Sequence, residues 1–144
     1  MSAAHDPRAE RRALELLRSV AGEDAAAMYE ELGFVGVEPR EGEGRYGYLI
    51  YPHRPVVAYD AASGELLSEY CVGFPDRSAG EAGERLPDAD DVLAKWIGLC
   101  ADERRLIGVA NMDRPGRQLD PGLVRRDLDT LRRWRADRTE EVPA

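Results

Sequence analysis

The fold is decided by residues 45–74, which read RYGYLIY (45–51), PHRP (52–55), VVAY (56–59), DAASGE (60–65) and LLSEYCVGF (66–74). Three runs rich in β-branched and aromatic residues are separated by two short segments that contain proline, aspartate and glycine. Such runs form strands, and such separators form turns. The stretch therefore predicts three antiparallel strands joined by two short connections.

A fourth strand is expected just before this stretch, because residues 34–37 form a short apolar run with β-branched residues. The predicted sheet has three to four antiparallel strands, at about 34–37, 45–51, 55–60 and 65–73. Side chains alternate between the two faces of a strand, and neither face of 45–51 is plainly polar. This indicates either helices on both faces of the sheet or one face left for a partner.

Apolar residues recur at helical spacing on both sides of the sheet segment. They predict an N-terminal helical segment at 7–32, divided into 7–20 and 24–32, and C-terminal helices within 88–136, the last at 121–136. Asp24 is the expected cap of the second helix, and Asp88 or Asp90 that of the third, with a break near Gly98 or Ala101. An antiparallel sheet, here within 34–74, packed against N-terminal and C-terminal helices, is an α+β fold.

A chain of 144 residues fits a single domain, 1–144. Glycine, proline and charged residues dominate 75–87, which predicts a mobile loop, and the tail at 139–144 is expected to fray. No apolar run approaches the roughly 18 residues needed to span a bilayer, and the N-terminus lacks the apolar core of a signal peptide. Two cysteines do not make a disulfide framework. The sequence thus predicts a cytoplasmic protein that does not enter membranes.

His53 is the first candidate for chemistry, because Pro52 and Pro55 fix the backbone around it. The two prolines predict a rigid, exposed tip that presents His53 and Arg54. The histidine is either a general base or ligand, or a polar turn residue. With two histidines and two cysteines scattered along the chain, we predict no metal site and no cofactor.

The strand at 65–73 carries two further candidates. Cys71 and Glu69 are two residues apart and therefore share a face. A contact between Cys71 and His53 would create a nucleophile and its base, whereas a buried structural cysteine is the alternative. Tyr48 and the other tyrosines of the sheet either stack nucleic-acid bases or pack across strands, and the acidic residues among them favour packing.

Arginines are concentrated in the last predicted helix. They include the neighbours Arg132 and Arg133, and acidic residues such as Asp127 and Asp129 are interleaved with them. A solvated helix face is the alternative to a phosphate-binding surface. The net charge of −8 also opposes attraction to nucleic acid and to anionic lipids.

The leading hypothesis is a small acidic interaction module, an adaptor, regulator or chaperone-like protein that binds another protein or a second copy of itself. It rests on the acidic composition and on the absence of a catalytic motif. The first alternative is an enzyme or small-ligand-binding domain with a cleft near His53, Cys71, Tyr48 and Glu69. The second alternative, which the net charge of −8 opposes, is nucleic-acid binding through Arg132 and Arg133.

Overall fold

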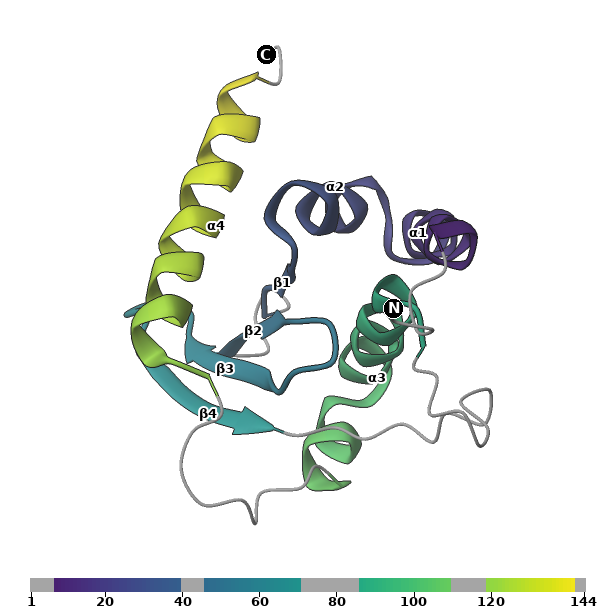
Figure 1. Ribbon diagram of the computed structural model, residues 1–144. Helices are drawn as coiled ribbons and strands as arrows, with labels where there is room; N and C mark the ends of the chain where they lie inside the picture. Colours follow the sequence, from purple (N-terminus) through teal and green to yellow (C-terminus); the bar gives the residue numbers. More distant parts are fainter. Residues whose placement is uncertain (1–6, 40–45, 71–85, 110–118, 142–144) are drawn as a thin grey trace.

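The computed structural model describes residues 7–39, 46–70, 86–109 and 119–141 (Figure 1). Its helices are α1 (Pro7–Ala21), α2 (Glu23–Leu32), α3 (Asp88–Val109) and α4 (Pro121–Glu141). Its strands are β1 (Val35–Val37), β2 (Tyr46–Ile50), β3 (Val56–Asp60) and β4 (Leu66–Tyr70), which form one antiparallel sheet in the order β1-β2-β3-β4. The α+β fold and the antiparallel sheet predicted from the sequence are confirmed.

Helices lie on both sides of the sheet. In Figure 1, α4 runs along one side and α3 lies on the other, with α1 beyond it. The approach of α4 is close, because a β-carbon added to Gly36 of β1 would overlap the side chain of Leu131. The sequence left open whether one face of the sheet stays bare, and the structure shows a helix against each face.

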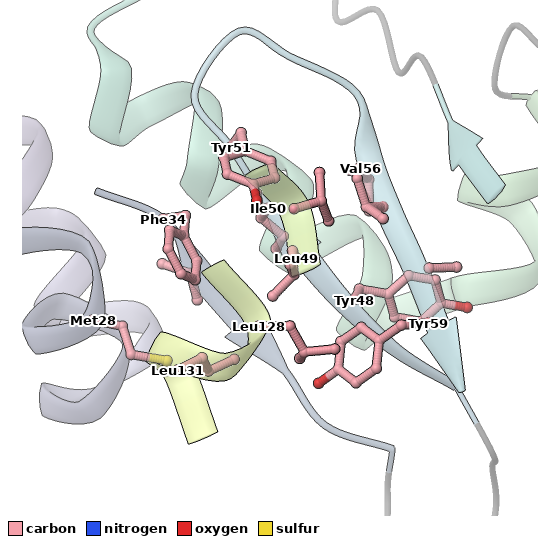
Figure 2. Close-up of a cluster of buried hydrophobic side chains, with 14 of the residues drawn as sticks. Met28, Phe34, Tyr48, Leu49, Ile50, Tyr51, Val56, Tyr59, Leu128 and Leu131 are labelled. Atoms are coloured by element: carbon pink, nitrogen blue, oxygen red, sulfur yellow. The ribbon is translucent and has the colours of Figure 1, made fainter. Parts of the chain in front are cut away.

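The core is formed mainly by the strands and by the helix residues that face them. Leu49, Ile50 and Val56 of the central strands are fully buried, as is Leu131 of α4. Figure 2 shows Leu128 of α4 next to the buried tyrosine side chains and Leu131 next to Met28. Burial of each such aliphatic side chain contributes about 1.5–3 kcal/mol to folding. Tyr48 belongs to this core. It therefore packs across strands, which was the alternative that the acidic residues among the sheet tyrosines favoured over base stacking.

The second hairpin connection forms as its residues predict. The Oδ1 atom of Asp60 accepts hydrogen bonds from the N–H groups of Ala62 and Ser63 at 2.9 and 3.0 Å. Gly64 then adopts a φ of +78°, which glycine reaches without steric cost. The hairpin is therefore closed by local chemistry within residues 60–65.

Helix boundaries differ from the sequence expectations at three points. α3 is continuous past Gly98 and Ala101, because one glycine costs only about 1 kcal/mol in a helix that packs elsewhere. α4 continues to Glu141, beyond the expected end at 136. Asp24 does not cap α2, which begins after Gly22 and has no side-chain cap. The loop expected at 75–87 lies mostly outside the described residues.

Glu10 of α1 joins three helices, which the sequence did not predict. Its Oε1 atom accepts a hydrogen bond from the N–H of Ala89 in the first turn of α3, at 3.0 Å. Its Oε2 atom accepts one from the hydroxyl of Tyr29 in α2, at 2.6 Å. Glu10, 79 positions away, thus accepts a hydrogen bond from an N–H group at the start of α3, where Asp88 or Asp90 had been expected as the cap.

No helix of the described ranges is long and apolar enough to cross a membrane.

Candidate functional site

The turn between β2 and β3 is anchored by a buried lysine. Lys95 of α3 is 2% exposed, and its Nζ atom donates hydrogen bonds to the carbonyl oxygens of Tyr51 and Arg54 at 3.0 and 2.8 Å. The same Nζ lies 2.6 Å from Oδ2 of Asp91, one helical turn earlier. All three donors of the ammonium group therefore have acceptors, two of which belong to the turn.

Asp91 completes the connection from the helix side. Its Oδ2 atom also accepts the backbone N–H of His53 at 2.7 Å. His53 is the single residue other than glycine with a positive φ, at +57°, among those described. A left-handed backbone costs a non-glycine residue about 1–2 kcal/mol. The bonds from Lys95 and Asp91 hold the backbone in this conformation.

The His53 ring points toward α3 and its preceding residues. Nε2 lies 2.9 Å from the carbonyl oxygen of Leu86 and 3.2 Å from Oδ1 of Asp88, while Nδ1 lies 3.8 Å from Oδ1 of Asp91. Since a carbonyl oxygen only accepts, Nε2 carries the hydrogen. The side chain is 17% exposed. The prediction of an exposed tip is therefore wrong for His53, because α3 covers the ring, and holds for Arg54, which is exposed.

A pocket of about 440 Å³ opens to solvent beside this turn. It is lined by Leu32, Gly33 and Phe34 from the end of α2, Tyr51 to Arg54 from the turn, Asp88 of α3 and Asp127 of α4. Four segments far apart in the sequence thus build its walls. The volume falls within the range of small-ligand sites, about 300–1,000 Å³.

The aromatic wall of the pocket is tied to α4. The hydroxyl of Tyr51 donates a hydrogen bond to Oδ2 of Asp127 at 2.8 Å. Burial and this bond raise the pKa of Tyr51, so the hydroxyl keeps its proton and remains a donor. The ring of Phe34 lies beside it, with the ring centroids 5.4 Å apart and the planes tilted by 45°.

The structure does not place Tyr48 or Glu69 of the predicted cleft in the pocket beside His53. Glu69 accepts the N–H of Leu119 at 2.9 Å, which connects β4 to the segment before α4. Tyr48 is in the core, and Cys71 lies outside the described residues. Neither Tyr48 nor Glu69 lines the pocket beside His53. Of the predicted cleft residues that the structure describes, His53 alone lines this pocket.

The arginines of α4 divide into two groups. Arg132 and Arg133 are exposed, as a solvated helix face requires. Arg135 pairs with Glu38 at 2.6 Å, and Arg138 pairs with Asp24 at 2.9 Å and lies over the ring of Trp134. Two of the cations are thus used to attach α4 to the segments around α2 and β1, which reduces the basic surface of the helix.

Lys95 and Asp91 are the residues that sequence reasoning missed. The sequence signal existed: Lys95 is the one lysine of the chain, and it lies among Val92, Trp96 and Leu99 at the i,i+4 position from Asp91. A charge on an apolar helix face requires a buried partner. That partner is the pair of turn carbonyls, whose position follows from the fold and not from the spacing of residues.

Within the described ranges, no group of three or more histidine, cysteine, aspartate or glutamate side chains is arranged to hold a metal ion. The side chains that line the pocket include two carboxylates, one guanidinium, one imidazole and two aromatic rings. Comparison of the chain with protein families, with curated proteins and with solved structures finds no match.

Proposed function

We propose that this protein is a small-ligand-binding domain whose site is the pocket beside His53. One observation carries the proposal: a buried lysine and a buried carboxylate fix the turn that forms a wall of the pocket. Burying two charges costs several kcal/mol per ion before their attraction is counted. Such an arrangement is a way to place Tyr51, His53 and Arg54 in a defined geometry.

A fixed wall favours binding because it lowers the entropy that is lost when a ligand is held. The pocket residues are constrained from several directions. Gly33 ends α2 with a left-handed φ of +86°, Tyr51 is bound to Asp127, and His53 is bound to Leu86 and Asp91. These constraints support a binding site that exists before the ligand arrives.

Catalysis is not part of the proposal. The Nε2–H of His53 is used by the Leu86 carbonyl, and Nδ1 faces the carboxylate of Asp91. A general base needs a nitrogen within hydrogen-bond reach of the substrate proton. We therefore assign His53 a positioning role, in which its ring helps to fix the turn.

A fragment titration followed by amide NMR tests this function. The library contains cationic, anionic and neutral fragments, and the reporters are the backbone amides of Gly33, His53 and Arg54. We expect at least one fragment to shift these amide signals in a saturable way. Arg54→Trp should weaken the binding of that fragment, because the indole fills the pocket mouth. Arg133→Trp, an exposed position on α4 away from the pocket, is the matched control. If no fragment of any charge shifts these amides, the proposal is wrong.

A second candidate is the protein-interaction module expected from the sequence. Leu16 and Val20 lie one turn apart on α1, and they are 49% and 46% exposed. Such a pair favours contact with another protein surface, a second copy of the chain included. Light scattering over a range of concentrations tests self-association, with Leu16→Glu as the variant and Leu123→Glu on α4 as the control. A mass that stays monomeric throughout removes the second copy as the partner.

A further inference from the structure

We infer that the pocket beside His53 selects an organic cation, an alkylammonium or guanidinium group. The inference rests on the proposed ligand-binding function and names the chemistry of the ligand. It follows from three features of the pocket wall: its formal charges, the helix end that it contains, and its apolar side chains.

The formal charge of the lining is negative. Asp88 and Asp127 contribute two carboxylates and Arg54 contributes one guanidinium, which leaves −1 when His53 is counted as neutral. The Asp88 side chain is 48% exposed, so it is open to a ligand as well as to His53. Arg54 also lines the pocket and acts on the Tyr51 hydroxyl by lowering its pKa, so its guanidinium offsets part of the negative charge.

The end of α2 adds to the negative potential. Leu32 and Gly33 line the pocket, and α2 has no basic side chain in its last turn. The C-terminal end of a helix carries roughly half a negative charge, which favours cations. The positive end of α3 is nearby, but three acidic residues occupy its first turn and Glu10 accepts the Ala89 N–H. That end is already neutralised.

The apolar side chains of the lining suit the organic part of the same ligand. Phe34 and Tyr51 both line the pocket, and their rings lie side by side. They are only 3% and 8% exposed, so they offer an apolar surface to the alkyl part of a ligand and no open ring face. Two carboxylates, a helix C-terminus and an apolar wall around one pocket therefore provide the contacts that an organic cation needs. An anion would meet two carboxylates there, and a neutral ligand would gain nothing from the charges.

The cation can be a free amine or a lysine or arginine side chain of a partner segment. Titrations of butylammonium, ethylguanidinium, butanol, butyrate and a blocked Ala-Lys-Ala peptide distinguish these cases, with the amides of Gly33 and His53 as reporters. We expect both small cations to bind more tightly than butanol and butyrate. Binding of the peptide as well would identify a side chain as an acceptable source, whereas binding of the small cations alone would identify a free amine.

Charge variants give the decisive comparison. Asp127→Asn keeps an acceptor for Tyr51 and is expected to weaken butylammonium binding about fivefold, in proportion to the loss of one partly exposed charge. Asp129→Asn makes the same change at an exposed site of α4 outside the pocket and should leave binding unchanged. Arg54→Gln should strengthen binding about threefold by removing a like charge.

Two results would overturn the inference. One is butyrate or butanol binding as tightly as butylammonium, and the other is Asp127→Asn binding the cation as well as the wild type. Either result, with a fragment that still shifts the pocket amides, contradicts the cation and leaves the ligand-binding site in place. A pocket that responds to no fragment and to no probe contradicts both proposals.

Discussion

The Nζ atom of Lys95 lies 2.6 Å from Oδ2 of Asp91, and this same oxygen accepts the N–H of His53 at 2.7 Å. One carboxylate oxygen thus joins a helix to a turn that is separated from it by 38 positions. The pair is buried, with side-chain exposures of 2% and 11%. Because the ammonium group also binds two turn carbonyls, loss of either charged partner affects helix and turn together.

Lys95→Met is expected to lower the free energy of unfolding by about 3–5 kcal/mol. Methionine has a similar length, but it leaves the Asp91 carboxylate buried without its counter-charge and two carbonyls without a donor. Chemical denaturation followed by circular dichroism measures the loss.

The matched control is Arg133→Met, an exposed site that should change stability by no more than about 0.5 kcal/mol. Asp91→Asn added to Lys95→Met should recover part of the loss, because it removes the unpaired charge. A Lys95→Met protein within about 1 kcal/mol of the wild type would contradict the anchoring role, since breaking a buried pair costs more than this.

His53→Gly is expected to be more stable than His53→Ala by about 1–2 kcal/mol. Both variants lose the ring contacts with Leu86 and Asp88, but only glycine adopts the observed φ of +57° without strain. Thermal unfolding of the two proteins gives the comparison. The control is Ala136→Gly at an exposed helical site, where glycine should destabilise the protein by about 1 kcal/mol relative to alanine. Equal stability of the two His53 variants would refute the backbone strain.

Gly47→Ala is expected to cost about 1–3 kcal/mol through overpacking. A β-carbon at this position would overlap the ring of Tyr59 on the paired strand. The cost should fall when Tyr59 is first replaced by leucine, and denaturation of the four proteins in this cycle measures the coupling. Gly122→Ala, whose added β-carbon meets ordinary contacts, should be neutral or stabilising.

The protein is expected to lose stability as the pH rises above about 10. Burial raises the pKa of Tyr29, Tyr51 and Tyr59 above the ordinary value of 10, so the folded state keeps protons that the unfolded state releases. The contribution of these tyrosines to the free energy of unfolding is therefore fully present below the unfolded pKa, and it declines as the pH increases beyond that value. Each tyrosine contributes a limiting slope of about 1.4 kcal/mol per pH unit.

Denaturation between about pH 8 and pH 11 measures this decline, and tyrosinate absorbance reports the ionisation. The three tyrosines should ionise together with unfolding. Tyr51→Phe should flatten the decline, at the cost of the bond to Asp127 at neutral pH. Independent ionisation of all tyrosines in the folded protein would show that burial does not hold their protons.

The fold could be predicted because its signals are local. Runs of β-branched and aromatic residues marked the strands, and the aspartate and glycine of residues 60–65 marked the hairpin. The continuity of α3 was missed because packing outweighs the cost of Gly98. The contact between Glu10 and Ala89 could not be predicted, since it depends on how two helices cross.

The candidate site was predicted only in part, for the same reason. The prolines around His53 indicated a rigid turn, and this turn lines the pocket. Its rigidity, however, also comes from Lys95, 41 positions after Arg54, through hydrogen bonds to backbone carbonyls that carry no side-chain signal. Asp127 likewise reaches Tyr51 over 76 positions. Long-range contacts of this kind follow from the packed structure.

Hydrogen exchange at the His53 amide tests most directly whether Lys95 and Asp91 fix the wall of the pocket. This amide lies in a turn, where exchange is ordinarily fast, but it donates to the Asp91 carboxylate. We predict protection of about a thousandfold or more, comparable with core amides of β2, and its loss in Lys95→Met. An amide that exchanges as fast as an open turn in the wild type, or equally slowly in both proteins, would contradict the anchored site.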